Sequence, residues 1–188
     1  MVSYNLFIKM KGDNMISFKI LTNVEENDDT TLKSKFFGSP VFPKNYLEIN
    51  NLNDDFFLLQ LNLKEISAYQ TLLPKDGYIY IFLEIDTNPV TPKVLYTNDE
   101  IEEEYENINE DFNMEDSTSK FIEFTSEEIG NALLTSEGEY ISLLTIDMEK
   151  VPDGFPNFNC PHGKIKFLIK EEDLKNQNYK NIKFYQEN

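Results

Sequence analysis

Residues 56–66 read FFLLQLNLKEI, and a related stretch, YISLLTIDMEKV, occupies residues 140–151. After an irregular segment, each stretch is followed by a proline, a glycine and a second apolar run. These second runs are PKDGYIYIFL at residues 74–83 and PHGKIKFLI at residues 161–169. A supersecondary unit of this size that occurs twice predicts a fold with internal repetition.

The spacing between the two copies is almost constant. Leu58 and Leu143 are 85 residues apart (143 − 58), and Gly77 and Gly163 are 86 apart (163 − 77). Apolar and polar residues alternate in these runs, which is typical of β-strands. We therefore expect an α+β fold, mainly antiparallel β, in which a single domain is built from two similar β-rich halves with a few short helices. The predicted halves cover about residues 34–96 and 121–185, with an acidic insert at about residues 97–120.

Local patterns predict the remaining elements. The apolar runs on both sides of Gly12-Asp13-Asn14 predict a β-hairpin over residues 4–22. Thr125 and Glu128 have the spacing of a capping box, which predicts a helix that continues to Leu134. Further expected elements are an extended segment at 36–43, a helical turn within 64–73, a strand at 93–96, a short helix from Glu171 and an edge strand at 182–185.

Length and composition bound the class of protein. A chain of 188 residues with 40% hydrophobic content suits one domain with a sizeable core. The longest apolar run, Tyr78 to Leu83, is far shorter than the roughly 20 residues that span a bilayer. No basic segment followed by an apolar stretch opens the chain, as it would in a secretory signal. The single cysteine, Cys160, cannot form an internal disulfide, and this fits the reducing cytoplasm, where we expect the protein to be located.

The chain is strongly acidic. Its net charge is −17, and all 17 of its basic residues are lysine. Arginine is the usual residue for bidentate binding of phosphate, so its absence, together with the repulsive field, argues against nucleic acid, nucleotide and anionic-lipid partners. The same charge instead favours a basic protein as the partner. An acidic surface also serves simply to keep a protein dispersed in solution. Residues 97–128 hold 13 acids and one base, and so carry −12 of the −17.

The acidic insert has the pattern of an amphipathic helix over residues 99–112. Its apolar residues, at spacings of four, three and four, are Ile101, Tyr105, Ile108 and Phe112. As a docking surface for a basic partner, this helix would present Glu102, Glu103, Glu106, Glu110 and Asp111. The apolar residues would add anchors if the helix does not already pack on the core. The simpler interpretation is a solvated helix face without a partner.

Six phrases in a fixed order carry a resemblance to a known family. They are SKFFGSPVFP (34–43), FLLQLNL (57–63), LLPKDGYIYIF (72–82), KVLY (93–96), LLTID (143–147), and GKIKFLI (163–169) with EDL (172–174). These phrases resemble the YwqG-like family of bacterial proteins of unknown function. The resemblance implies that residues 1–188 form a single mainly antiparallel α+β domain built from two similar halves. It transfers no catalytic residue, because the family has none established. Family members are usually longer, with a helical N-terminal part and a fuller middle region.

Candidate catalytic and metal-binding residues are few. His162 is the only histidine, and an extended segment would place its imidazole on the same side as the thiol of Cys160. A zinc site needs further ligands, however, and a nucleophile needs an oxyanion site. The alternative is that His162 belongs to the turn equivalent to Asp76-Gly77 in the first copy. We favour the turn, and we assign no catalytic residue, no metal site and no cofactor.

Two functions from different classes remain. The first is a non-enzymatic protein-binding module that docks a basic partner through the acidic insert, and an immunity-type protein that neutralises a toxin is one version of it. The second is a small-ligand-binding protein, or an enzyme of unknown reaction, with a pocket between the two halves. Such a pocket is expected to be lined by Tyr78, Tyr80, Cys160 and His162.

Overall fold

A computed structural model describes residues 15–22, 24–25, 27, 30–105, 108–109, 112 and 118–187. Most of the described strands join one sheet. They are β1 (Ile16–Leu21), β2 (Lys35–Phe36), β4 (Phe56–Asn62), β5 (Tyr78–Glu84), β6 (Thr91–Thr97), β8 (Lys120–Thr125), β9 (Ala132–Glu137), β10 (Tyr140–Asp147), β11 (Lys164–Lys170) and β12 (Lys183–Glu187). Two further strands, β3 (Val41–Phe42) and β7 (Glu103–Glu104), pair with each other. The helical elements are α1 (Tyr46–Ile49), α2 (Leu63–Ile66), α3 (Glu171–Lys175) and the 3₁₀ turn η2 (Tyr179–Asn181).

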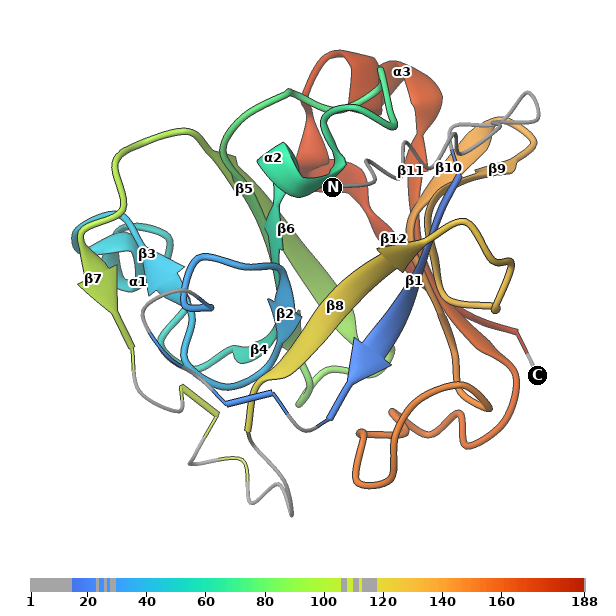
Figure 1. Ribbon diagram of the computed structural model, residues 1–188, viewed down its shortest axis with the longest axis horizontal. Coiled ribbons are helices and arrows are strands. Elements are labelled where there is room, and N and C mark those ends of the chain that lie inside the picture. The colour runs from blue at the N-terminus through green and yellow to red at the C-terminus, as the bar shows by residue number, and fades with distance from the viewer. Residues whose placement is uncertain are drawn as a thin grey trace, which may run out of the picture.

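The ten-stranded sheet curls into a nearly closed barrel (Figure 1). Its strand order is β12-β11-β10-β9-β1-β8-β2-β4-β5-β6, with antiparallel neighbours throughout. The two end strands, β6 and β12, approach each other, so the sheet almost closes on itself. The expected mainly antiparallel β fold with a few short helices is therefore confirmed. No helix in the described part of the chain is long and apolar enough to cross a membrane.

The main core fills the inside of this barrel. Strands from both ends of the sheet contribute to it, and Phe18 of β1, Ile79 of β5 and Phe167 of β11 are fully buried there. Because side chains alternate along a strand, β5 places Tyr80 and Phe82 on its other face. The run from β5 is apolar on both faces because both faces are covered.

A second core lies on the outer face of β4 and β5, under a cover made by β3, α1 and β7 (Figure 1). Its buried aromatic residues are Phe42, Tyr46, Phe57, Tyr80 and Phe82. The hydroxyl of Tyr80 donates a hydrogen bond of 2.6 Å to the carbonyl oxygen of Val41, which ties the cover to β5. The expected extended segment at 36–43 is confirmed in part: it contains β3 and lies buried on the core, but the chain bends at Phe37 and Gly38, where φ is positive.

The hairpins β4–β5 and β10–β11 contain the same irregularity. Each has a β-bulge in its first strand, between Phe57 and Leu59 in one hairpin and between Ser142 and Leu144 in the other. A bulge adds one residue to a strand and so breaks the strict alternation of faces. As a result, two consecutive leucines in each strand face the main core.

The two hairpins also begin their second strands with similar turns. The backbone N–H of Leu63 donates to the carbonyl oxygen of Gly77 at 3.0 Å, and that of Met148 donates to Gly163 at 2.9 Å. Both glycines have a positive φ, +92° and +86°, which a side chain would strain. A Cβ atom on Gly77 would also lie 2.3 Å from the carbonyl oxygen of Thr97, so only glycine fits there.

The predicted acidic helix over residues 99–112 is wrong in its first half. Strand β7 occupies part of it and pairs antiparallel with β3, and the rest of 99–105 has no regular structure. The backbone is held by the cover: the N–H of Glu102 donates to the carbonyl of Phe42 at 3.1 Å, and the N–H of Tyr105 donates to that of Pro40 at 3.0 Å. Pairing with β3 therefore replaces the hydrogen bonds of a helix.

The predicted helix from Thr125 to Leu134 is also wrong. Strand β8 ends at Thr125, and β9 begins at Ala132. The Thr125 hydroxyl accepts a hydrogen bond of 3.2 Å from the N–H of Glu127, which makes a local turn. Strand β9 has hydrogen-bonded neighbours in β1 and β10, and this tertiary pairing outweighs the local helix signal.

The other expected elements are found. Helices α2 and α3 and strands β6 and β12 lie where they were predicted. Strand β1 is the second strand of the predicted hairpin over residues 4–22, and the first lies outside the described residues. Gln60, on the polar face of β4, is fully buried. Its side chain accepts from the N–H of Val41 at 2.8 Å and donates to the carbonyl of Lys33 at 2.9 Å, because the chain covers this face too.

Candidate functional site

Cys160 and His162 do not face each other. Cys160 is buried in the main core, and its thiol donates to the backbone carbonyl of His162, with 3.0 Å between Sγ and O. Burial raises the pKa of the Cys160 thiol, so it stays protonated at neutral pH. The side chain of His162 is exposed. The bond from the thiol is therefore to the backbone of His162 and not to its imidazole.

Tyr78 and Tyr80 lie on the opposite face of the sheet from Cys160. Tyr80 is fully buried in the second core, and the ring of Tyr78 stacks beside it with 5.9 Å between ring centroids. The Tyr78 ring is half-buried and reaches the surface. The structure therefore brings the two tyrosines together but places Cys160 in the other core and His162 in solvent. Of the four, Tyr78 is the one that lines a hollow described below.

The acidic insert is only partly described. Glu102 is exposed, and Asp99, Glu100 and Glu104 beside it are exposed too. The remaining predicted docking residues, namely the side chain of Glu103, and Glu106, Glu110 and Asp111, lie outside the described residues. Of the four apolar residues that were predicted as anchors, Ile101 lines a hollow described below, and the other three pack inward. Tyr105 and Ile108 pack against the second core and Phe112 against the main core.

Asn109 is a residue whose role the sequence did not reveal. It is fully buried, and its side-chain amide binds both backbone groups of Phe57. The N–H of Phe57 donates to Asn109 Oδ1 at 2.8 Å, and Asn109 Nδ2 donates to the carbonyl of Phe57 at 2.7 Å. These two bonds satisfy the backbone at the bulge and hold the acidic insert against β4. In the sequence, the signal for this role was an asparagine within a run of acidic residues. That signal did not indicate that its side chain binds the backbone of Phe57.

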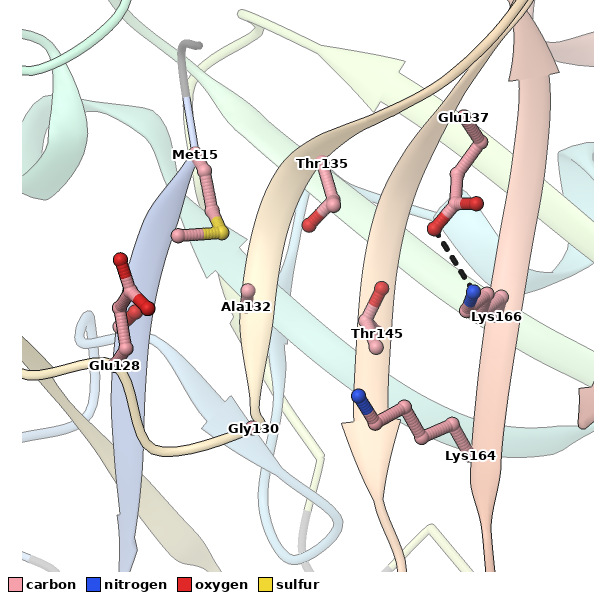
Figure 2. A pocket seen from close by; sticks show the side chains of 10 residues that line it. Met15, Glu128, Gly130, Ala132, Thr135, Glu137, Thr145, Lys164 and Lys166 are labelled. Atoms are coloured by element: carbon pink, nitrogen blue, oxygen red, sulfur yellow. Dashed lines mark ion pairs between the residues drawn. The ribbon is translucent and has the colours of Figure 1, made fainter. Parts of the chain in front are cut away.

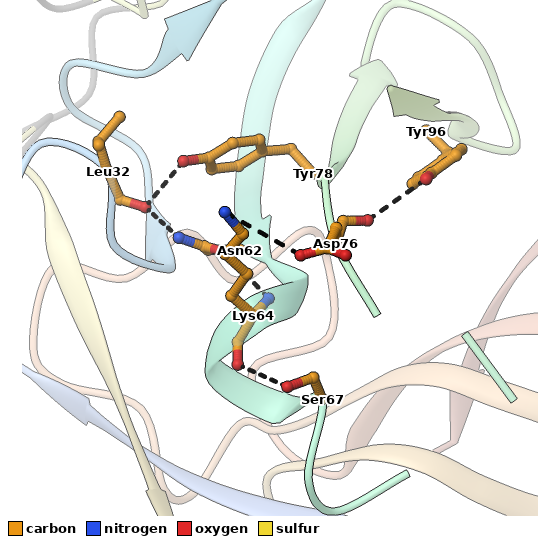
Figure 3. A network of polar contacts seen from close by, with 7 residues as sticks. All are labelled: Leu32, Asn62, Lys64, Ser67, Asp76, Tyr78 and Tyr96. Atoms are coloured by element: carbon orange, nitrogen blue, oxygen red, sulfur yellow. Dashed lines mark hydrogen bonds and ion pairs between the residues drawn. The ribbon is translucent and has the colours of Figure 1, made fainter. Parts of the chain in front are cut away.

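A hollow of about 540 Å³, here called the acidic cleft, lies where the acidic insert begins. Its lining residues are Leu32, Asn62, Lys64, Asp76, Gly77, Tyr78, Asn98, Asp99 and Ile101. Figure 3 shows the contacts that shape one wall. Asn62 Nδ2 donates to the carbonyl of Leu32 at 2.9 Å, and Asn62 Oδ1 accepts from the N–H of Lys64 at 3.1 Å, which caps α2. The Tyr78 hydroxyl lies 3.4 Å from the same Leu32 oxygen.

The charges in the acidic cleft favour a cation. Asp76 and Asp99 are exposed carboxylates, and the single basic residue of the lining is Lys64, whose ammonium is 4.0 Å from Asp76. Asp99 is oriented by the hydroxyl of Thr97, which donates to it at 2.9 Å. The pKa of Tyr78 is raised, first by burial and then by the nearby charge of Glu65, so its ring stays neutral. A neutral tyrosine face beside two carboxylates suits an ammonium or guanidinium group.

A second hollow, here called the polar groove, has a volume of about 240 Å³ and lies on the outer face of β9, β10 and β11 beside β1 (Figure 2). Its lining residues are Met15, Ser17, Glu128, Gly130, Ala132, Thr135, Glu137, Thr145, Lys164 and Lys166. In β11 the buried apolar residues alternate with less buried ones, and Lys164 and Lys166 point away from the main core into the groove. The groove itself could not be predicted, because its walls come from distant parts of the chain.

Lys166 is held by two carboxylates at one end of the groove. Its ammonium is 2.8 Å from Glu137 and 2.7 Å from Glu187, and only 12% of its side chain is exposed. The hydrogen bonds and charges of these partners outweigh burial and raise the pKa of Lys166. Lys166 therefore stays charged, and it links the turn-side end of β9 to the end strand β12.

Comparisons with known proteins add no family. No model of a known protein family matches this chain, and neither does any curated protein. The resemblance to YwqG-like proteins therefore stays a prediction from the sequence phrases. Within the described residues, no group of three or more histidine, cysteine, aspartate or glutamate side chains is arranged to hold a metal ion.

Proposed function

We propose that this protein is a non-enzymatic binding module that docks a basic protein partner through one acidic face. The acidic face consists of the acidic cleft and the exposed carboxylates beside it, Glu100, Glu102 and Glu104. The observation that carries the proposal is the cleft, in which two aspartates stand beside a tyrosine ring and a single lysine. A lysine or arginine side chain of the partner would enter it.

Two properties of the acidic face support docking. The backbone bonds of Glu102 and Tyr105 and the amide of Asn109 hold these three residues in place, so less ordering entropy is lost there on binding. A cation over the ring of Tyr78 gains about 0.5–1 kcal/mol at an exposed site, and each aspartate adds a charge-assisted hydrogen bond. The net charge of −17 steers a basic partner toward the protein, and salt weakens this attraction.

We also propose that the fold is a duplication, as in the YwqG-like resemblance, and that the protein is cytoplasmic. The matching bulges and glycine turns of β4–β5 and β10–β11 support the duplication. The strand order supports it as well, since β2-β4-β5-β6 and β9-β10-β11-β12 run outward from the central pair β8 and β1. An immunity-type role, with a basic toxin as the partner, is one version of the docking proposal.

Two charge-matched variants test the docking proposal in pull-downs from the native host's lysate at low and high salt. The face variant carries Asp76→Asn, Asp99→Asn and Glu102→Gln. The control variant neutralises three exposed carboxylates elsewhere, with Glu139→Gln, Glu149→Gln and Asp153→Asn. We expect one basic protein to be recovered with the wild type and the control, in a salt-sensitive manner, and to be lost from the face variant. Equal recovery with both variants, or no partner at low salt, would overturn the proposal.

A further inference from the structure

The polar groove holds two charged side chains of opposite sign, one on each side. The carboxylate of Glu128 stands in the loop before β9, on one side of the groove, and the ammonium of Lys164 stands at the start of β11, on the other (Figure 2). Neither side chain forms a hydrogen bond or an ion pair with a described residue, in contrast to Lys166, although the charge of Lys164 acts weakly on Glu187. The groove therefore presents one available charge of each sign.

The lining of the groove also includes a hydroxyl without a hydrogen-bond partner among the described residues. Thr135 Oγ1 is buried and has no hydrogen-bond partner within the described part of the chain. On the neighbouring strand, by contrast, Thr145 Oγ1 is 2.8 Å from the hydroxyl oxygen of Ser142. Buried polar atoms in folded proteins nearly always have a partner. Thr135 is therefore placed to bind a polar group that enters the groove.

The charge balance of the groove decides which ligand it suits. Lys166 is already paired with Glu137 and Glu187, so Glu128 and Lys164 are the lining charges left to interact with a ligand. A simple anion would be attracted by Lys164 and repelled by Glu128, and a simple cation would meet the opposite arrangement. A molecule that carries both charges is attracted at both ends. In a protein of net charge −17, a neutral zwitterion is also not repelled by the overall field.

We propose that the polar groove binds a small zwitterion with one ammonium and one carboxylate group, of the size of an amino acid. The carboxylate pairs with Lys164, the ammonium pairs with Glu128, and the hydroxyl of Thr135 hydrogen-bonds one of these two groups of the ligand. The volume of about 240 Å³ is below that of pockets for drug-sized ligands, which begin at about 300 Å³. Met15 and Ala132 supply apolar contacts for the carbon chain of the ligand.

A titration with ω-amino acids of increasing chain length tests this proposal. Glycine, β-alanine, 4-aminobutyrate and 6-aminohexanoate carry the same two charges at growing separation, and acetate and ethylammonium carry one charge each. NMR of the full chain follows the backbone amides of Ala132 and Thr135 during each titration. We expect one chain length to bind best, and both single-charge probes to bind at least about tenfold more weakly, the loss that follows from one charged hydrogen bond.

Matched variants locate the site. Lys164→Gln and Glu128→Gln should each weaken the best probe about tenfold, whereas Lys170→Gln on the same strand and Glu127→Gln in the same loop should leave it unchanged. Thr135→Val should weaken binding, and Thr135→Ser, which keeps the hydroxyl, should restore it. The proposal is overturned if no probe shifts the groove amides, if acetate binds as well as the zwitterions, or if the control variants lose binding equally. These residues lie outside the acidic face, so the outcome does not depend on the docking proposal.

Discussion

The outer face of the hairpin β4–β5 is aromatic and covered, whereas the outer face of β10–β11 is polar and hollowed. Phe57 and Ser142 occupy the same place, one residue before the bulge leucine of each hairpin. Tyr80 and Lys166 also correspond, since each stands three residues after the turn glycine. Phe57 and Tyr80 belong to the second core, whereas Lys166 lines the polar groove.

This difference shows how one backbone arrangement can carry two surfaces. The bulge and the turn decide which side chains enter the main core, and they are alike in both hairpins. The residues on the outer face of each hairpin then decide whether another segment of the chain packs against that face. Aromatic rings gain by burial and attract a cover, whereas a charged Lys166 and its carboxylates would lose hydration under one. The second hairpin therefore keeps a groove where the first has a second core.

The largest expected difference in stability is between substitutions at the matched positions Phe57 and Ser142 of the two hairpins. Phe57→Ala removes a fully buried ring that lies 5.4 Å from Phe82 and 6.1 Å from Phe42 between centroids. We expect it to lower the free energy of unfolding by about 3–5 kcal/mol, because it leaves a cavity. Ser142→Ala removes one buried hydroxyl, which bonds the carbonyl of Leu144 at 2.9 Å, and should cost only about 1 kcal/mol. Urea unfolding of both variants measures the difference, and equal losses would contradict the comparison.

A smaller effect is expected where the acidic insert is tied to the covered face. Asn109→Ala leaves the buried N–H and C=O of Phe57 without their partners, so it should cost about 2–4 kcal/mol. Asn109→Asp keeps an acceptor but no donor, so it should not restore stability. Asn98→Ala, at an exposed position, serves as the control. Urea unfolding gives the cost, and a stability of Asn109→Ala close to that of the control would show that the tie does not stabilise the fold.

The strands of both hairpins could be predicted because their signals are local. Alternating apolar residues and a turn glycine lie within a few positions of one another, and no distant residue is needed to interpret them. The bulges were harder to predict from the sequence. Strict alternation places Leu58 and Leu59 on opposite faces, and the structure places both in the main core. Only the pairing with β5 reveals the extra residue.

The errors and the unpredicted sites have a common physical cause, which is contact between distant segments. The spacing of Ile101, Tyr105 and Ile108 fits a helix, but strand β7 lies between the first two, and Tyr105 and Ile108 pack against the second core. Asn109 bonds a residue 52 positions away. The walls of the acidic cleft and of the polar groove are assembled from several strands and loops, so no single motif marks them.

The smallest effect on stability is expected on the outer face of β10–β11, at the ion pair between Lys166 and Glu187. The hydrogen bond from Lys166, and then its charge, lower the pKa of Glu187, and Lys164 adds a weaker contribution. Lys166→Met should therefore raise this pKa toward the ordinary glutamate value of about 4.3, and Lys164→Met should raise it less. NMR titration of the Glu187 carboxylate measures both shifts. An unchanged pKa in Lys166→Met would show that the pair is not formed in solution.

The sign of the pH dependence follows from the lowered pKa of Glu187. A carboxylate whose pKa is lower in the folded than in the unfolded chain stabilises the fold fully above the unfolded value, and this contribution disappears as the pH falls through the folded value. Acid should therefore remove it from the wild type, whereas Lys166→Met lacks the part that comes from Lys166 at every pH. The stability difference between the two should narrow below about pH 4. Because half of the Glu187 side chain is exposed, solvent screens the pair and the change should be small. The covered face has Tyr80 at the corresponding position, and Tyr80→Phe changes no charge there in this pH range, so its effect on stability should stay constant through the same acid titration.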